Sequence, residues 1–394
     1  MTPDAPKNPL APNSGGTGLG EDAGASPLTS PPSTVVGLGG PSSPDLSVAV
    51  VSYNTCGLLR ACLASLHARQ AEGEATLEII VADNGSTDGS PAMVRAEFPA
   101  VRLVETGGNV GFGRANNLAL RDARGRCFCL LNSDAEALPG ALAKTLAFLD
   151  AHPGVGLAGG QLLWPDGRAQ TSWGSDPTLA GVWQEQTFCG AVRARMQKPG
   201  TGSAGLLPNG SRSATEEASV GSSVVPEALS LPSRPALPVP GVSPRDVDQI
   251  CGAYMVIRRG AWRQVGGFDP AYFMYNEDVD LNVRLRRAGW RVVFLPDVPI
   301  RHHLGASSRA DWQTRARMVS AYNQSREYYF TRYAGPDAGR RLRAYCLLGT
   351  AIRLTGWSLL SVVKPSARDK VKLFREVWRR TQEMTGGEGM TGGQ

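Results

Sequence analysis

Short apolar runs alternate with helical patterns between residues 46 and 150, and this alternation constrains the fold most strongly. Residues 46–53, 77–82, 101–104 and 127–131 are apolar runs of strand length. The apolar residues between the first two runs recur at helical spacing, as do those in 115–123 and 138–149. Strands that are apolar on both faces and separated by helices form a mainly parallel sheet. The sequence therefore predicts an α/β domain with helices flanking the sheet.

The pattern resumes after residue 245. Residues 250–257 and 291–295 predict two more strands, 261–269 a short helix and turn, and 277–289 a longer helix. We therefore expect one domain over residues 46–335.

Two segments lack the large apolar side chains that a folded core needs. Residues 1–45 and 198–245 are rich in Pro, Gly and Ser, so ordering them would lose entropy without compensating contacts. The first is predicted to be a disordered tail and the second a low-complexity insertion within the domain.

Polar residues follow three of the predicted strands, where ligands bind to sheets of this kind. Asn54 follows the first strand, Asp83 and Asn84 the second, and the triplet Asn132-Ser133-Asp134 the strand that ends at Leu131. Any one of these residues could serve a turn or a helix cap. Three such strand ends in one sheet indicate a ligand site. Asp134 offers hard oxygen ligands suited to Mg²⁺ or Mn²⁺, although a helix cap would explain it almost as well.

A glycine-rich loop at residues 107–113 precedes a predicted helix that begins with Arg114, Asn116 and Asn117. Exposed backbone N–H groups in such a loop can approach a phosphate or a sugar.

Three acids, Glu277, Asp278 and Asp280, stand on the first turn of the predicted helix after 276. The helix dipole accounts for part of this, and Asp280 can pair with Arg284 one turn on. The apolar residues at 273–275 are not required by the dipole. They predict a partly dry setting that raises the pKa of a carboxyl, as a general base requires.

His302 and His303 are two of only four histidines and follow the strand at 291–295. A single histidine in a loop is usually structural, whereas an adjacent pair after a core strand is a candidate for metal binding.

Charge and cysteine content bound the cellular setting. Segment 340–380 holds eleven Lys or Arg against two acids, whereas the whole chain has a net charge of +6. Because the basic surplus lies in that one segment, we expect no nucleic-acid partner. The seven cysteines include no C-x-x-C pair and several lie in apolar runs, which favours a reducing, cytoplasmic compartment. The first residues do not resemble a signal peptide.

Residues 336–394 are predicted to form a basic, amphipathic helical extension with a flexible end. Its stretch 344–363 is apolar apart from Arg353, which would cost several kcal/mol at the centre of a bilayer. The segment either lies on an anionic membrane surface, peripheral to the inner face of the plasma membrane, or packs on the domain.

Taken together, seven short motifs resemble those of the family 2 glycosyltransferases, in particular the rhamnosyltransferase-like branch of cell-wall and polysaccharide assembly. They are Val51-Ser-Tyr-Asn54, Asp83-Asn-Gly-Ser86, Asn109-Val-Gly-Phe-Gly113 with Asn116-Asn117, Leu131-Asn-Ser-Asp134, Gly266-Gly-Phe-Asp269, Glu277-Asp-Val-Asp280 with Arg284 and Gly289, and His302-x-x-Gly305-x-Ser307. The resemblance implies a GT-A fold and an inverting transfer from a nucleotide-diphosphate sugar to a saccharide or lipid-linked acceptor.

The resemblance also implies roles for individual residues. Asp278, with Glu277 beside it, would be the catalytic base, and Asp83 would bind the nucleotide base. Asp134 and His302, with His303 as the alternative, would bind Mg²⁺ or Mn²⁺, and Asn132 stands where many relatives carry an aspartate. The remaining predicted donor-binding residues are Ser52, Asn54, Asn84, Asn109, Gly111, Phe112, Arg114, Asn116, Asn132 and Ser133. The predicted acceptor-binding residues are Gly252, Ala253 and Trp173.

Two alternatives stay open at this point. One is a non-catalytic nucleotide-sugar-binding or interaction protein with a degenerate transferase fold. The other is a processive synthase that adds many sugars to one acceptor. Because the Q-x-x-R-W sequence of such enzymes does not occur, a single transfer per acceptor is favoured.

Overall fold

The computed structural model describes residues 43–187, 243–303 and 311–384. The predicted tail up to residue 42, the predicted insertion up to residue 242 and the predicted flexible end after residue 384 lie outside these ranges.

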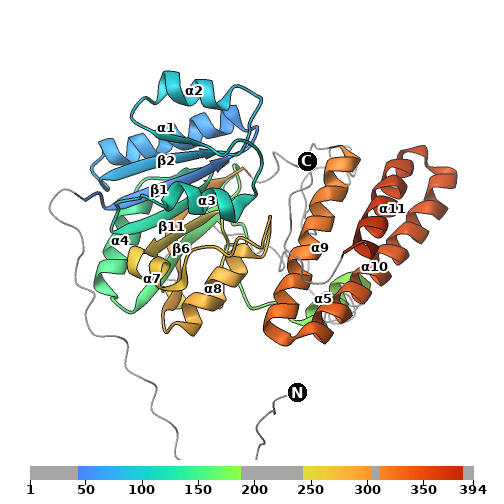
Figure 1. The fold of residues 1–394 in the computed structure, drawn as a ribbon. Coiled ribbons are helices and arrows are strands. Elements are labelled where there is room, and N and C mark those ends of the chain that lie inside the picture. The colour runs from blue at the N-terminus through green and yellow to red at the C-terminus, as the bar shows by residue number, and fades with distance from the viewer. Residues whose placement is uncertain (1–42, 188–242, 304–310, 385–394) are drawn as a thin grey trace, which may run out of the picture. The chain divides into compact units, whose positions relative to one another are not determined.

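The described residues form one large mixed sheet with helices on both faces (Figure 1). Its order is β3-β2-β1-β4-β10-β6-β11-β5, and β8 pairs with β11. The strands of this sheet are β1 (Leu46–Ser52), β2 (Leu77–Asp83), β3 (Arg102–Glu105), β4 (Cys127–Asn132), β5 (Ala135–Ala137), β6 (Val155–Leu163), β8 (Arg245–Asp246), β10 (Tyr254–Arg258) and β11 (Arg291–His302). A separate pair is formed by β7 (Trp173–Gly174) and β9 (Gln249–Ile250).

One half of the sheet is entirely parallel, because strands β3, β2, β1 and β4 are connected by helices that cross over its faces. In the other half β10 runs antiparallel to both β4 and β6, while β6 and β11 are parallel. The predicted α/β class, with helices flanking the sheet, is confirmed.

Helices cover both faces of the sheet, and each face has its own apolar core. One core contains residues of α1 (Cys56–Ala71), α2 (Ser90–Glu97) and α4 (Ala141–Ala151). The other contains residues of α3 (Phe112–Leu120), α7 (Arg259–Val265) and α8 (Glu277–Arg287). Strand residues such as Val48 and Ala49 alternate between the two cores, because successive side chains of a strand point to opposite faces.

The structure corrects two predicted strand boundaries and adds a strand. Residues 250–257 do not form one strand, since a turn at residues 251–253 separates β9 from β10. The strand predicted at 291–295 continues as β11 to His302, with an irregularity between Leu295 and Pro299. Strand β6 was not predicted at all.

A group of helices follows the sheet in the chain: α9 (Trp312–Ala334), α10 (Pro336–Val363), the short 3₁₀ helix η2 (Pro365–Ala367) and α11 (Arg368–Gln382). Helix α10 packs against α9 and α11 and also against α5 (Leu179–Thr187). By length and composition alone, α10 could cross a membrane.

Candidate active site

The polar strand ends predicted to form a site lie side by side in the sheet. Ser52 at the end of β1 is in register with Asp83 at the end of β2, and Val51 is in register with Asn132 at the end of β4. Parallel pairing thus brings three segments of the sequence to one edge, where ligands bind in sheets of this kind.

Asp83 has one carboxylate oxygen engaged and one that is unpartnered. Its Oδ2 accepts hydrogen bonds from the N–H groups of Gly85 (3.2 Å) and Ser86 (2.9 Å). Its Oδ1 is buried and has no hydrogen-bond partner among the described residues. A buried polar atom without a partner costs free energy, so Oδ1 is suited to accept a hydrogen bond from a ligand.

Asn84 fixes the glycine-rich loop. Its Nδ2 donates to Oδ1 of Asn109 (2.9 Å), and its Oδ1 accepts the N–H of Val110 (2.9 Å). Oδ1 of Asn109 also accepts the N–H of Gly111 (3.1 Å). These side chains therefore hold the shape of the loop from inside it.

The glycine-rich loop reaches the segment before α8 at Gly111. The N–H of Phe112 donates to the carbonyl of Phe273 (3.0 Å). Gly111 has φ +91°, and a Cβ there would lie 2.1 Å from that carbonyl oxygen, so only glycine fits. The predicted donor loop is thereby joined to the segment that carries the predicted base.

The remaining predicted residues of this region differ in accessibility. Asn54, in the left-handed conformation, accepts the N–H of Thr87 (2.8 Å) and is exposed. The hydroxyls of Ser52 and Ser133 are buried and linked through Thr55 (3.0 and 2.9 Å). Asn116 is also buried and donates to the carbonyl of Phe112 (3.0 Å) in its own helix.

The predicted metal ligands meet just beyond the carboxyl end of β4. Nε2 of His302 lies 3.3 Å from Oδ1 of Asp134 and 3.5 Å from Nδ2 of Asn132. The antiparallel pairing of β11 with β5, which places His302 opposite Ala135, produces this contact.

His302 is oriented by Gln170. Nδ1 of the histidine lies 3.0 Å from Oε1 of Gln170, and Nε2 of Gln170 donates to the carbonyl of His302 (2.6 Å). If Nδ1 donates to the amide oxygen, Nε2 carries the lone pair that faces Asp134. Both side chains are buried.

His303 points elsewhere. Its Nε2 lies 2.6 Å from Oε1 of Glu136, and Glu136 also pairs with Arg301 (3.2 Å). Of the two histidines, His302 is the one that faces Asp134. The described residues contain no group of three or more His, Cys, Asp or Glu side chains placed to bind a metal ion.

Helix α8 starts from a strained backbone. Tyr275 and Asn276, directly before the helix, both have left-handed conformations with φ of 67° and 61°. For residues other than glycine this conformation is costly and persists only where the surroundings enforce it, often at functional sites. Asp278, which follows this strained segment, faces the turn between β9 and β10.

Asp278 lies against that turn. Its Oδ2 accepts the N–H of Gly252 (3.0 Å), and its Oδ1 accepts the N–H of Val279 (2.9 Å). The carbonyl of Ala253 accepts the N–H of Asn132 (3.1 Å). The dipeptide Gly252-Ala253 therefore links the start of α8 to the end of β4, which precedes Asp134.

The two carboxyls at the start of α8 are destabilised as anions. Burial raises the pKa of Asp278 above its ordinary value, and the two N–H donors oppose this in part. Burial and the neighbouring Asp278 charge raise the pKa of Glu277 well above its ordinary value. Oε2 of Glu277 is buried without a partner among the described residues. An upward shift makes the carboxylate a stronger base, because its pKa then lies closer to the working pH.

The third acid has a structural role. Asp280 is fully buried, pairs with Arg284 (2.6 Å) and accepts the hydroxyl of Tyr333 in α9 (2.6 Å). One turn after Asp278, the buried Asn282 donates to the carbonyls of Ile250 (3.1 Å) and Asp278 (2.7 Å). Asn282 thus fixes the turn from which Gly252 donates.

The predicted acceptor-binding residues lie on and beside the turn after β9, because Trp173 is in register with Ile250. Gly252 contacts Asp278, whereas Ala253 is buried in the core. Trp173, on β7, packs next to Phe294 and lies under the guanidinium of Arg245 at 4.0 Å.

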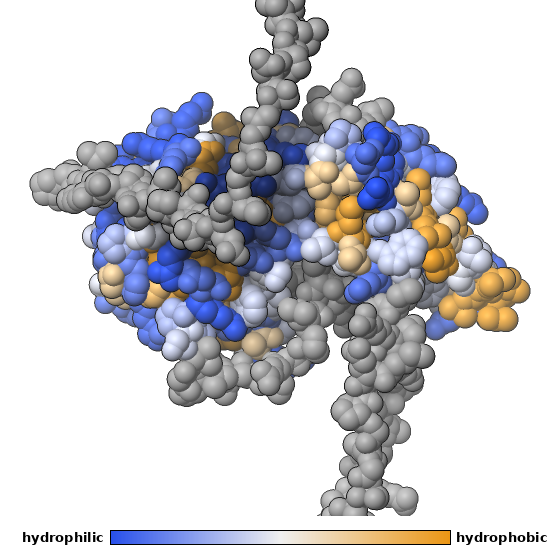
Figure 2. Space-filling model, turned by 90° about the horizontal axis from the view of Figure 1, so that it is seen from below, coloured by the Kyte–Doolittle hydropathy of each residue, from blue (hydrophilic) through white to orange (hydrophobic). Residues whose placement is uncertain are grey.

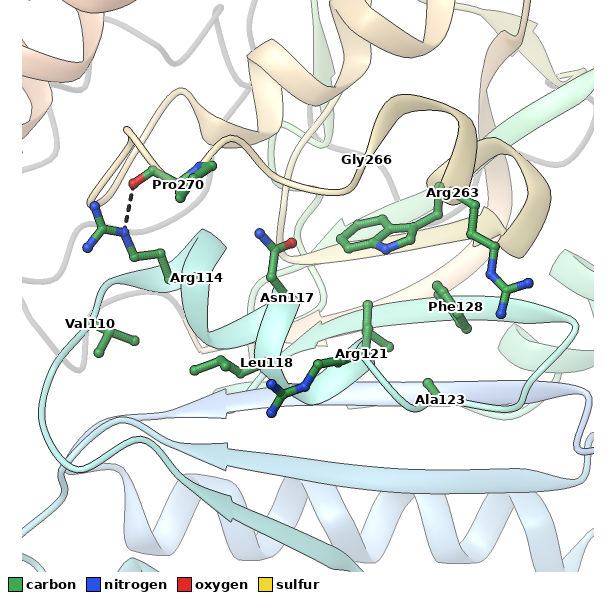
Figure 3. Close-up of a pocket in the computed structure, with 12 residues that line it drawn as sticks. Val110, Arg114, Asn117, Leu118, Arg121, Ala123, Phe128, Arg263, Gly266 and Pro270 are labelled. Atoms are coloured by element: carbon green, nitrogen blue, oxygen red, sulfur yellow. Dashed lines mark hydrogen bonds between the residues drawn. The ribbon is translucent and has the colours of Figure 1, made fainter. Parts of the chain in front are cut away.

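A pocket of about 540 Å³ lies on the face of the sheet covered by α3 and α7 (Figure 3). It is lined by residues that include Asn117, Trp262 and Arg263, and Arg114 at its edge donates to the carbonyl of Pro270 (2.7 Å). Arg114 is the one predicted site residue among its lining. The pocket is therefore not the space between Asp134 and Asp278.

Two residues that shape the site were not predicted. Gln170 meets His302 from a distant part of the chain, so no local pattern marks it. Asn282 stands four residues after Asp278, on the same face of α8, and a buried amide at that spacing could have been recognised.

Two family models and several known proteins match this chain in sequence. Residues 47–203 match the model of the glycosyl transferase family 2, and residues 241–327 match that of the glycosyltransferase-like family 2. The N-acetylglucosaminyl-diphospho-decaprenol L-rhamnosyltransferase of Mycobacterium tuberculosis (strain H37Rv) is 30% identical over 348 residues, which cover 83% of this chain and 97% of that protein. Rhamnosyltransferase WbbL of Escherichia coli (strain K12) is 39% identical over 64 residues, 16% of this chain and 24% of its own length.

A solved structure with a similar arrangement is the mannosyltransferase PcManGT from Pyrobaculum calidifontis. It is 18% identical, covers 86% of each chain and has a TM-score of 0.42. The matches in sequence do not favour the non-catalytic alternative. The chain is a nucleotide-sugar glycosyltransferase of cell-surface polysaccharide biosynthesis, and it belongs to glycosyl transferase family 2.

Proposed function

We propose that this protein transfers a single L-rhamnosyl residue, with inversion, from a nucleoside-diphosphate donor to N-acetylglucosaminyl-diphospho-polyprenol. The sugar and the acceptor follow the relative that is 30% identical and covers 83% of the chain. The observation that carries the proposal is the link from Asp278 through Gly252 and Ala253 to Asn132, which joins the base to the metal-binding strand end.

The donor would bind at the carboxyl ends of β1, β2 and β4. The unpartnered Oδ1 of Asp83 would accept a hydrogen bond from the nucleotide base. The loop that Asn84 and Asn109 hold in place would line the same pocket. Because these amide groups are engaged with the loop itself, we assign them to positioning rather than to direct binding.

A divalent cation, Mg²⁺ or Mn²⁺, would be held by Asp134 and His302. The fit rests on the contact between Oδ1 of Asp134 and Nε2 of His302, and on Gln170, which orients the ring. Two protein ligands leave positions for the donor diphosphate and water. When bound, the cation would stabilise negative charge on the departing diphosphate.

Asp278 would act as the general base. A carboxylate held by two backbone N–H groups is fixed in place yet keeps lone pairs free. As the acceptor hydroxyl attacks the anomeric carbon, Asp278 takes its proton and the bond to the diphosphate oxygen breaks. Direct displacement of this kind inverts the anomeric centre.

The protein would work in the cytoplasm on the inner surface of the membrane. The middle of α10 is held within the protein, because Arg353 donates to the carbonyls of Glu185 (3.3 Å) and Gln186 (3.3 Å) in α5. The end of α10 is exposed, with Leu359 at 70%, Val362 at 84% and Val363 at 78%. Figure 2 shows hydrophobic residues gathered at the end of the molecule that α10 and α11 occupy in Figure 1.

Exposed cations lie beside this apolar end: Lys364, Arg368, Lys372 and Arg375. Apolar side chains at the tip and cations behind them suit an interfacial contact with anionic lipid. A lipid-linked acceptor would then be reached without leaving the membrane surface.

Transfer assays test the proposal. Purified protein is incubated with nucleoside-diphosphate-rhamnose and a short-chain N-acetylglucosaminyl-diphospho-polyprenol, with Mn²⁺ or with a chelator. We expect a rhamnosylated lipid and free nucleoside diphosphate with the metal present. Transfer of another sugar from a donor panel, but not of rhamnose, would contradict the proposed donor and leave the glycosyltransferase assignment intact.

A further inference from the structure

Two tyrosines form a corner beside the proposed base. Tyr275 lies two residues before the start of α8, and Tyr322 lies on α9. Their rings meet edge to face at a centroid distance of 5.6 Å. Both side chains are only partly buried. We refer to Tyr275 and Tyr322 as the aromatic corner.

The position of Tyr322 is fixed from behind. The guanidinium of Arg326, one turn further along α9, lies 4.9 Å from the centre of its ring. Arg326 is buried and forms a two-pronged ion pair with Glu185 of α5 (3.1 and 3.0 Å). A buried ion pair with this geometry holds both partners in place, so the Tyr322 ring has little freedom to turn away.

Tyr275 is fixed equally well. Its backbone is in the left-handed conformation, and the preceding carbonyl, of Met274, accepts a hydrogen bond from Ser325 of α9 (2.7 Å). Helix α9 therefore fixes both members of the aromatic corner. It carries Tyr322 itself, and its Ser325 holds the backbone next to Tyr275.

The aromatic corner lies within electrostatic reach of the active site. Burial together with the nearby carboxylates, Asp278 among them, raises the pKa of Tyr322 to about 12. Burial and Glu277 raise the pKa of Tyr275 to about 12. Both phenols therefore stay protonated at physiological pH and can donate hydrogen bonds. Neither hydroxyl has a hydrogen-bond partner among the residues that the structure describes.

We propose that the aromatic corner binds the saccharide of the acceptor, with the Tyr322 ring against the apolar face of the pyranose and the base next to its nucleophilic hydroxyl. This inference rests on the proposed function. Rigid aromatic rings with a free hydroxyl offer an apolar face and a polar edge, which is what a sugar ring presents. A ring fixed beforehand also loses little entropy on binding.

The test compares three variants. Tyr322→Leu removes the ring, and Tyr322→Phe removes only the hydroxyl. Tyr345→Leu removes a tyrosine of α10 that packs edge to face against Trp183 of α5 and is not part of the aromatic corner. We measure the acceptor KM, the donor KM, and the slow release of nucleoside diphosphate without acceptor. Melting temperatures show whether each variant is folded.

We expect Tyr322→Leu to raise the acceptor KM about tenfold, with donor KM and acceptor-free release unchanged. Tyr322→Phe should have a smaller effect, and Tyr345→Leu none. An unchanged acceptor KM in folded Tyr322→Leu would overturn the inference, as would an equal rise in donor KM. Failure of the wild type to transfer rhamnose would instead refute the proposed function.

A binding measurement makes the inference independent of turnover. Titration calorimetry of the Asp278→Asn protein with N-acetylglucosamine diphosphate gives an acceptor affinity in the absence of reaction. Adding Tyr322→Leu to that protein should weaken the affinity about tenfold, and equal affinities would overturn the inference.

Discussion

Nε2 of His302 lies 3.3 Å from Oδ1 of Asp134, although the two residues are far apart in the sequence. The contact arises because the end of β11 pairs antiparallel with β5, the short strand that follows Asp134. Gln170 holds the other ring nitrogen, so the histidine meets the carboxylate in one orientation. This pair is the part of the site best suited to a divalent cation.

The metal proposal predicts the effect of removing Gln170. Gln170→Ala should weaken Mn²⁺ activation by about 10- to 100-fold, because the partner that orients a histidine ligand contributes about that much to metal affinity. His302→Ala should weaken it further. The concentration of Mn²⁺ that gives half-maximal transfer is the measurement. His303→Ala serves as a control, because His303 faces Glu136, and equal losses in both histidine variants would contradict the assignment.

Asp278 supplies the second prediction. Asp278→Asn should lower kcat by about 10²- to 10⁴-fold, the range of general base catalysis, while donor affinity stays the same. In the wild type, kcat should fall as the pH is lowered through the pKa of Asp278, which burial places above its ordinary value of 3.8. A pH profile of kcat locates this limb. Near-normal turnover of Asp278→Asn would remove the base from the mechanism.

Glu277 predicts a dependence of stability on pH. Because burial raises its pKa in the folded protein above the ordinary value of 4.5, the folded state binds the proton more tightly than the unfolded state. The free energy of unfolding therefore falls as the pH rises above that value. Glu277→Gln has no proton to lose, so its melting temperature should exceed that of the wild type by a margin that grows between pH 4 and pH 8. A constant difference would show that the carboxyl is not protonated in the fold.

Much of the fold follows from local pattern. The apolar runs that became β1, β2 and β4 are buried on both faces, so their sequences indicate strands without ambiguity. Strand β6 was missed because its sequence, Val155–Leu163, contains glycines that weaken a strand prediction. Those glycines are needed for close packing, since a Cβ at Gly159 would lie 2.2 Å from Ile250 and one at Gly160 would lie 2.4 Å from the carbonyl oxygen of Val298.

The sequence predicts those site residues whose side chains are reactive or can bind a ligand, but not the residues that position them. Asp83, Asp134 and Asp278 stand at element ends, where a carboxylate is noticeable in sequence. The residues that position them are not visible there. The sequence around Gly252 predicts a strand and not the turn that is observed, and Gln170 meets His302 only in the folded protein. Long-range pairing decides such contacts, and one sequence contains little of that information.

The turn at Gly252 yields the fourth prediction. A Cβ added at this residue would lie 3.3 Å from Oδ2 of Asp278, which is tighter than ordinary contact. Gly252→Ala should therefore displace the base and lower kcat by about tenfold or more, since small misplacements of reacting groups are costly. The melting temperature should change little. Gly154→Ala, at a glycine outside the site with open space around its Cβ position, controls for the loss of backbone freedom alone. Full activity of Gly252→Ala would mean that the base does not depend on the turn.

The exposed end of α10 gives the last prediction, on membrane binding. Replacement of Leu359, Val362 and Val363 by serine should abolish sedimentation with phosphatidylglycerol vesicles, because these side chains are the apolar tip of the proposed contact.

Replacement of Lys364, Arg368 and Lys372 by glutamine should weaken binding to the vesicles and make it less sensitive to salt, since each cation near an anionic surface contributes about 1 kcal/mol. Arg121→Gln, at an exposed cation directly after α3 and outside α10 and α11, should leave binding unchanged. Both multiple variants should still transfer sugar to a water-soluble acceptor, because the altered residues lie outside the catalytic sheet. Equal sedimentation with neutral phosphatidylcholine vesicles would contradict the role of the basic residues, and undiminished binding of the serine variant would place the membrane contact elsewhere.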